Sequence, residues 1–177
     1  KPAEGWPLNY KPADVGLESD VVDGQPDDLV VSWDFRGRKM RGWRKMMGIS
    51  ELTPTEEGLS IVSSTDDPAI DHAIPLSRLS DYWQVVVRMK ASRDARGPVR
   101  FFWAPADNRT NERMKIALPI VADGEFHDYA FRVGARTEWT NTQIMRLRFD
   151  PCESAGSTCV VQSITLEPFS AKTSSRK

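Results

Sequence analysis

The sequence predicts an all-β protein, a jelly-roll β-sandwich of about nine or ten short antiparallel strands in two facing sheets. Three observations favour this fold class. Apolar and polar residues alternate in one segment after another, which is the two-residue period of a half-buried strand. No part of the chain shows a helical period. Clusters of Gly, Pro, Asn and Asp separate the segments at short intervals, as is typical of sandwiches and jelly rolls.

The alternation is clearest in Tyr82–Lys90, where every second side chain from Trp83 to Met89 would face the core. The other predicted strands are, in chain order, Leu29–Phe35, Gly58–Ser63, Pro68–Ile74 and the segments centred on Phe101, Leu118, Phe131, Leu147 and Ile164. Each is short and bounded by turn residues, so we expect antiparallel connections throughout.

The composition divides the chain into three parts. Residues 1–27 contain four prolines and no periodic pattern, which predicts an irregular arm, and Trp6, Leu8 and Tyr10 are its candidates for contact with the sandwich or with a partner. Residues 28–169 form the predicted sandwich, and residues 170–177 are a Ser- and Lys-rich tail. A total of 177 residues fits one domain with such extensions.

The charge balance bears on the class of partner. The net charge is -1, which argues against nucleic-acid binding and against purely electrostatic membrane binding. Arg36–Lys45 holds six cations, but residues 14–28 are acidic, so mutual neutralisation is the simpler interpretation. No apolar run reaches 18 residues, and we therefore expect no transmembrane segment.

Two cysteines, Cys152 and Cys159, lie close together in the sequence. Their spacing fits a disulfide across a hairpin loop, with a pair of free thiols as the alternative, and lacks the further ligands of a zinc site. A disulfide implies an oxidising compartment, so we expect a secreted, periplasmic or cell-surface protein.

Catalytic motifs find no support in the sequence. His72 and His127 are far apart, and each is better explained as an ordinary half-buried histidine than as a base. The acids Asp66 and Asp67 precede a proline, where turn chemistry accounts for them. We expect no enzyme; the alternative is a small hydrolase that brings two carboxylates together from distant strands.

The outward positions of the central strands suggest a binding face instead. Tyr82, Gln84 and Arg88 share a face of one predicted strand, Arg146 and Arg148 share a face of another, and Arg100 and Phe102 alternate with core positions in a third. If these strands are neighbours, the face offers hydrogen bonds to vicinal hydroxyls and aromatic contact for sugar rings. The alternative is a solvated face whose arginines pair with nearby acids.

Two tryptophans fall outside the clean strand patterns. Trp43 follows Gly42 among cations, and Trp139 lies in the polar segment Thr137–Asn141. We predict that either contacts sugar from a loop, with coverage of the end of the core as the alternative.

The order of these features resembles the galactose-binding-like jelly-roll domains, which are carbohydrate-binding modules. The matching motifs, over roughly residues 28–168, are Trp33-Asp34-Phe35, Gly42-Trp43, Gly58-Leu59-Ser60-Ile61, Asp67-Pro68-Ala69-Ile70, Phe102-Trp103, Asp123-Gly124-Glu125-Phe126-His127 and Arg146-Leu147-Arg148-Phe149-Asp150-Pro151. The resemblance implies glycan binding and, in many members, a structural Ca²⁺ where the first and last strands meet. Asp34, Asp150 and Glu167 are the candidate oxygen donors for that ion.

The sequence therefore predicts a non-catalytic carbohydrate-binding module of an exported protein, binding from a shallow face or a loop rim. The alternative is a structural subunit of a surface layer, filament or multi-protein complex that docks through its N-terminal arm.

Overall fold

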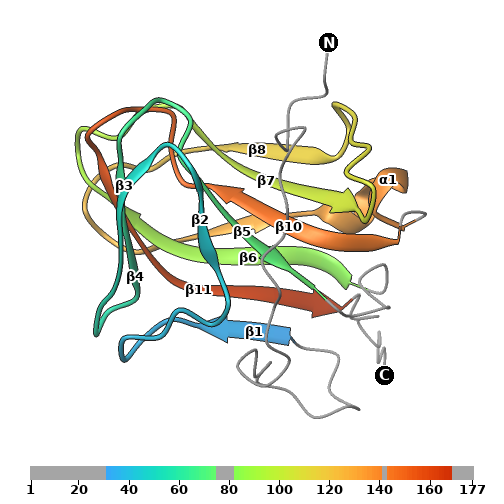
Figure 1. Cartoon of the computed structure of the whole chain (residues 1–177), viewed down its shortest axis with the longest axis horizontal. Helices are drawn as coiled ribbons and strands as arrows, with labels where there is room; N and C mark the ends of the chain where they lie inside the picture. The colour runs from blue at the N-terminus through green and yellow to red at the C-terminus, as the bar shows by residue number, and fades with distance from the viewer. Residues whose placement is uncertain (1–30, 75–81, 141–142, 169–177) are drawn as a thin grey trace, which may run out of the picture.

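The chain folds into a sandwich of two antiparallel sheets (Figure 1). The computed structural model describes residues 31–74, 82–140 and 143–168, so the predicted arm (1–27) and tail (170–177) lie outside the described residues. The all-β fold class predicted from the alternation is confirmed.

One sheet has six strands and the other has five. The six-stranded sheet comprises β1 (Val31–Asp34), β3 (Ile49–Pro54), β4 (Leu59–Ser63), β6 (Tyr82–Ala91), β9 (His127–Phe131) and β11 (Thr158–Pro168), in the order β3-β4-β11-β6-β9, with β1 also paired to β11. The five-stranded sheet comprises β2 (Arg44–Met47), β5 (Ala69–Ala73), β7 (Pro98–Pro105), β8 (Lys115–Pro119) and β10 (Ile144–Asp150), in the order β2-β5-β10-β7-β8.

Two short helical segments follow β9. They are the 3-10 turn η2 (Val133–Ala135) and the helix α1 (Thr137–Thr140). Within the described ranges, no helix has the length and apolarity needed to cross a membrane.

Nine of the eleven strands coincide with predicted segments, whereas β2 and β3 do not. Both are edge strands, one in each sheet. The side chains of β2 are only partly buried or exposed, so its sequence lacks the buried apolar positions that mark a strand. β3 likewise has a single fully buried residue, Ile49.

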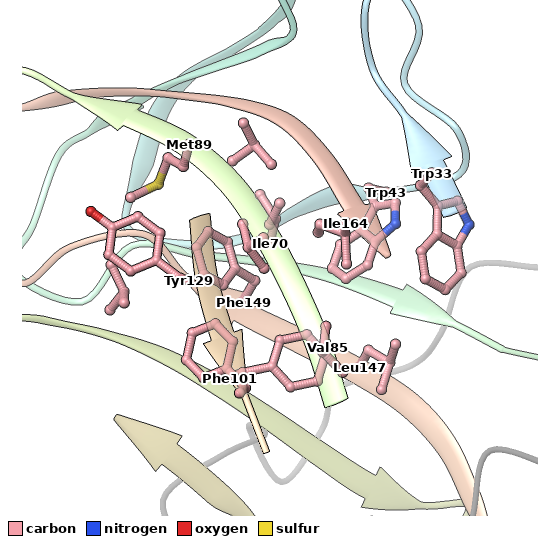
Figure 2. Packing of buried hydrophobic residues seen from close by; sticks show 14 of the residues in the cluster. Trp33, Trp43, Ile70, Val85, Met89, Phe101, Tyr129, Leu147, Phe149 and Ile164 are labelled. Carbon is pink, nitrogen blue, oxygen red and sulfur yellow. The ribbon is translucent and has the colours of Figure 1, made fainter. Parts of the chain in front are cut away.

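The core between the sheets combines aromatic and aliphatic side chains (Figure 2). Phe101 of β7 and Phe149 of β10 both pack near Phe131 of β9, with ring centroids 5.6 and 6.4 Å from it. All three side chains are completely buried. Burial of each such ring stabilises the fold by roughly 2–3 kcal/mol relative to exposure, so these contacts fix which face of each strand turns inward.

The predicted alternation of β6 is confirmed in its centre and wrong at its start. Val85, Val87 and Met89 are fully buried. The register with β11 shifts between the pairs Glu167–Gln84 and Pro168–Tyr82. This irregularity turns Tyr82 into the core, at 8% exposure, and leaves Trp83 only half-buried.

Gly58 allows the turn before β4 to lie directly against the backbone of β11. Its φ is +154°, and a Cβ added there would lie 2.3 Å from the carbonyl oxygen of Val161. Gly124 also has a positive φ, +86°, but nothing lies within 4 Å of an added Cβ. A substitution at Gly124 therefore introduces backbone strain alone, whereas a substitution at Gly58 also introduces steric overlap.

We predict that Gly58→Ala destabilises the protein more than Gly124→Ala. Gly124→Ala should cost about 1–2 kcal/mol through its backbone conformation, and Gly58→Ala should add about 1–3 kcal/mol because Val161 is backbone of a central strand and must shift. Urea denaturation of both variants measures the difference. Equal losses of unfolding free energy would contradict the close approach.

Candidate functional site

A row of polar and aromatic side chains crosses all five strands of the five-stranded sheet. Strand pairing aligns Lys115 with Phe102, Phe102 with Arg148, Arg148 with Asp71, and Asp71 with Arg44. Because side chains of paired residues point to the same side of a sheet, these five form one line on the face away from the core. We call them the cross-sheet row.

Contacts within the cross-sheet row are close. The Arg148 guanidinium lies 4.5 Å from the Phe102 ring centroid, and the Lys115 ammonium lies 6.0 Å from it. At the other end, Arg44 Nε donates to the Asp71 carboxylate at 3.1 Å. Phe102 thus lies between two cations, and Asp71 lies between two arginines.

Arg148 is the centre of the charged network. Its Nε and Nη2 donate to the two oxygens of Asp150, each at 2.7 Å, and Nη2 also reaches Asp67 Oδ1 at 3.0 Å. The side chains of Arg148 and Asp150 are 5% and 1% exposed. A two-pronged pair of this kind is geometrically specific, and breaking it by removing one partner costs about 3–5 kcal/mol.

Arg146 lies beside the cross-sheet row with small neighbours. It pairs with Ala73 on β5 and with Ala104 on β7. Its Nη1 donates to Asn108 Oδ1 in the loop after β7. The alanines leave the long guanidinium side chain as the main feature of this part of the face.

Burial shapes the electrostatics of this face. It raises the pKa of Asp150 to about 6, against the opposing effect of Arg148, so the carboxyl is ionised at neutral pH and remains paired. Burial also lowers the pKa values of Arg44 and Arg146. Both stay far above neutral pH because guanidinium is so strongly basic.

The arrangement offers the chemistry that recognises polyhydroxylated or anionic ligands. Guanidinium groups donate paired hydrogen bonds to vicinal hydroxyls or carboxylates, and an aromatic ring offers an apolar surface. Arg146 and Arg148 were both predicted to share a face, and the structure brings them together. Asp71, Arg44 and Lys115 join them only through pairing with distant strands, a signal that no local pattern contains.

The prediction that Trp43 and Trp139 contact sugar from exposed loops is wrong, because both are core residues. Trp43 is 1% exposed and packs edge-on to Trp33 at 5.6 Å. Trp139 is fully buried in α1, where its ring meets Trp103 at 5.4 Å and its Nε1 donates to the Tyr82 carbonyl at 3.0 Å. Both belong to the main core cluster, which is nearer to the alternative interpretation.

The predicted contribution of Tyr82, Gln84 and Arg88 to the same face is also wrong. They belong to β6 in the six-stranded sheet, whereas Arg146 and Arg148 belong to the other sheet. Tyr82 is in the core, and Gln84 donates to Glu167 on the neighbouring strand. Arg88 pairs with Asp128 at 3.0 Å and Gln162 at 3.1 Å, so this outer face is a solvated surface with its own partners.

The three candidate calcium ligands do not form one group. Among the described residues, no set of three or more His, Cys, Asp or Glu side chains could hold a metal ion. Asp34 accepts from Arg36 at 2.6 Å, which lowers the pKa of Asp34. Asp150 pairs with Arg148 in the opposite sheet, and Glu167 accepts from Gln84. These three residues therefore do not form a calcium site, and calcium binding itself stays a prediction.

Cys152 and Cys159 are buried free thiols in the structure, so the predicted disulfide is not formed there. Cys152 Sγ donates to the Ser154 carbonyl at 3.7 Å and Cys159 Sγ to the Pro151 carbonyl at 3.9 Å. The influence of each thiol on the other lowers the pKa of Cys152 to about 6 and raises the pKa of Cys159. Sequence spacing therefore identified neighbours correctly, and their oxidation stays a prediction.

His72 lies directly beneath the cross-sheet row, on the core side of β5. Its ring is 5.2 Å from that of Trp33 and 5.5 Å from that of Trp43. In the part of the chain that the structure describes, its Nδ1 has no hydrogen-bond partner. Burial, aided by the charge of Arg44, lowers the pKa of His72 to about 4, and the side chain is thus a buried neutral aromatic.

The chain has the β-sandwich fold of carbohydrate-binding modules. It is similar to a low-affinity xylan-binding module of family 86 from the gut symbiont Roseburia intestinalis, with a TM-score of 0.53 and 10% identity over 80% of this chain and 96% of that one. A family 29 module from Piromyces equi gives a TM-score of 0.55 at 12% identity, covering 78% of this chain and 91% of that one. A family 29 variant in complex with mannohexaose gives 0.57 at 12% identity, covering 77% and 89%.

No family model and no curated protein matches the chain. The fold that the resemblance implied, a β-sandwich like that of carbohydrate-binding modules, is confirmed.

We predict that His72→Phe removes part of the acid sensitivity of folding. The unfolded chain binds a proton at His72 below pH 6.5, whereas the folded chain does so only near pH 4, so stability is lost as the pH falls between these values. Between pH 7 and pH 4, the unfolding free energy of the variant should rise by about 3 kcal/mol relative to that of the wild type.

Urea denaturation at several pH values tests this prediction. Asp150 titrates with the opposite sign, since its raised pKa favours the folded state as the pH falls. That effect is common to both proteins and cancels in their difference. A stability difference that does not change with pH would show that His72 is already protonated or solvated in the fold.

Proposed function

We propose that this chain is a non-catalytic carbohydrate-binding module whose ligand lies on the outer face of the five-stranded sheet. The observation that supports this proposal is the cross-sheet row, set on a fold that xylan-binding and mannohexaose-bound modules share.

The dimensions of the cross-sheet row suit an oligosaccharide. Neighbouring strands lie about 4.8 Å apart, so a line across five strands extends about 19 Å. Arg44 and Lys115, whose side chains are 27% and 23% exposed, supply donors at its two ends, and Phe102 contributes an aromatic ring between them. A ligand longer than one sugar is needed to contact both ends.

The opposite sheet face is a weaker candidate. There, Arg88 pairs with Asp128, and Lys90 pairs with Glu57 at 2.6 Å. The Asp128 and Glu57 side chains are 59% and 61% exposed. Such exposed pairs contribute little and rearrange readily.

The cysteine pair supports an exported protein. The two thiols are buried in contact with each other, at the base of the loop that joins β10 to β11. In an oxidising compartment, loss of two electrons and two protons to a disulfide or quinone oxidant joins the sulfurs. The closed loop would hold the end of β10, and with it Asp150, in place.

We predict that Lys115→Gln combined with Arg146→Gln weakens binding to polysaccharide at least tenfold, because both cations face the proposed ligand. The matched control is Arg88→Gln combined with Lys90→Gln, which removes the same charge from the other sheet and should leave affinity unchanged. Affinity electrophoresis in xylan, glucomannan and polygalacturonate, followed by calorimetry, measures the change, and tenfold corresponds to about 1.4 kcal/mol.

Two results would contradict the proposal. If the intact chain is retarded by no polysaccharide in a broad panel, glycan binding is not its function. If the control pair loses as much affinity as the test pair, the ligand binds the six-stranded sheet.

We also predict that the chain exported to an oxidising compartment has one intramolecular disulfide. Its intact mass should be about 2 Da lower than that of the reduced chain, and a peptide linking Cys152 to Cys159 should appear after digestion without reductant. Two freely alkylated cysteines in the exported protein would refute the bridge.

A further inference from the structure

Three buried nitrogen atoms in the core have no hydrogen-bond partner. Within residues 31–74, 82–140 and 143–168, the buried side-chain nitrogen and oxygen atoms in this condition are Trp33 Nε1, Trp43 Nε1 and His72 Nδ1. The three residues are 1%, 1% and 2% exposed. A buried polar group without a partner loses its hydration with nothing in return, and native proteins pair nearly all such groups with protein atoms or ordered water.

The three side chains form one cluster. The ring centroids of Trp33 and His72 lie 5.2 Å apart, those of Trp43 and His72 5.5 Å, and those of the two indoles 5.6 Å. Figure 2 shows the two indoles side by side. Each ring thus contacts both of the others, so the three unpaired nitrogens point to one shared partner.

Two other buried tryptophans show how this fold pairs an indole elsewhere. Trp103 Nε1 donates to the Glu138 carbonyl at 3.2 Å, and Trp139 Nε1 donates to the Tyr82 carbonyl at 3.0 Å. Both indoles are completely buried, as Trp33 and Trp43 nearly are. The absence of a carbonyl partner therefore distinguishes Trp33 and Trp43 from equally buried indoles of the same core.

The chemistry of the three nitrogens matches that of a water molecule. An indole N–H only donates, whereas a neutral imidazole has one donor nitrogen and one acceptor nitrogen. Water that accepts from two indoles and donates to the imidazole makes about three hydrogen bonds, which is usual for an internal water. With about 2.9 Å to each partner, one water bridges atoms up to about 6 Å apart, a reach that suits the ring spacing.

Charge disfavours an anion in the same place. Burial and the charge of Arg44 lower the pKa of His72 to about 4, so its ring is neutral at pH 7. Arg44 is already paired with the fully buried Asp71 carboxylate at 3.1 Å. Burial of a further anion among aromatic rings is costly without a cation of its own. A neutral ligand with both donor and acceptor capacity fits better.

We propose that one water molecule is bound inside the core, where it accepts hydrogen bonds from Trp33 Nε1 and Trp43 Nε1 and donates one to His72 Nδ1. It links β1 of the six-stranded sheet to β5 of the five-stranded sheet. Because both lone pairs of this water are engaged, it cannot accept from His72, and the imidazole carries its proton on Nε2. The proposal is independent of glycan binding.

Water contacts in NMR spectra of the full ¹⁵N-labelled chain test the site. The Hε1 protons of Trp33 and Trp43 should show cross-peaks to water with opposite signs in NOE and ROE spectra, which marks a long-lived bound water rather than proton exchange. The indoles of Trp103 and Trp139 are internal controls and should show none. Long-range ¹H–¹⁵N spectra should show the His72 proton on Nε2.

A matched pair of variants isolates the histidine. His72→Phe keeps an aromatic ring but removes the acceptor, and should weaken the water cross-peaks of Trp33 and Trp43 about twofold or more. The control is His127→Phe at the other histidine of the chain, which should leave both cross-peaks unchanged. The wild-type spectra decide the proposal even if His72→Phe does not fold.

Four results would overturn the proposal. Indole protons that lack water contact and are shifted strongly upfield would show that the N–H groups point at neighbouring ring faces instead. A His72 proton on Nδ1 would remove the acceptor. Indole signals that move when chloride replaces a larger anion at constant ionic strength would identify a bound anion. Water cross-peaks that keep their full intensity in His72→Phe would show that the histidine is not a partner.

Discussion

The central strand β10 fixes both the core and the candidate site, because its side chains alternate between the two faces of its sheet. Leu147 and Phe149 are fully buried between the sheets, and this burial sets the rotation of the strand. Arg146, Arg148 and Asp150 are consequently turned to the other face together. A slip of one residue in the register would place three charged groups in an aromatic core, at a cost far above the stability of a domain.

The charges on β10 are themselves buried, which changes what they contribute. Removing a carboxylate and a guanidinium from water costs several kcal/mol for each ion, and their mutual attraction largely offsets that cost only when the geometry is good. Arg148 meets this condition with two contacts of 2.7 Å to Asp150. We therefore interpret the network as a device for positioning Arg148 over Phe102 rather than as a source of stability.

The two outer faces of the sandwich differ in a way that relates structure to function. On the six-stranded sheet, Arg88 and Lys90 pair with exposed acids and both pack on the Phe126 ring, so solvent weakens each ion pair. On the five-stranded sheet, the pairs lie in a line, share partners and are shielded from water. Interactions in such an environment are stronger and more dependent on one another, and a ligand that contacts one member affects the others.

The sequence by itself determined nine of the eleven strands and, in the centres of those strands, most of the residues that share a face. The alternation in Tyr82–Lys90 and around Leu147 was sufficient to turn Arg146 and Arg148 outward together, and the cysteine spacing was sufficient to identify two neighbours. Only the tertiary structure decided that β6 and β10 lie in different sheets, that Asp71 and Lys115 join Arg148, and that Trp43 and Trp139 fill the core. The reason is physical, because the period of a strand is a local property, whereas strand pairing and the space left at the ends of a sandwich depend on residues far apart in the chain.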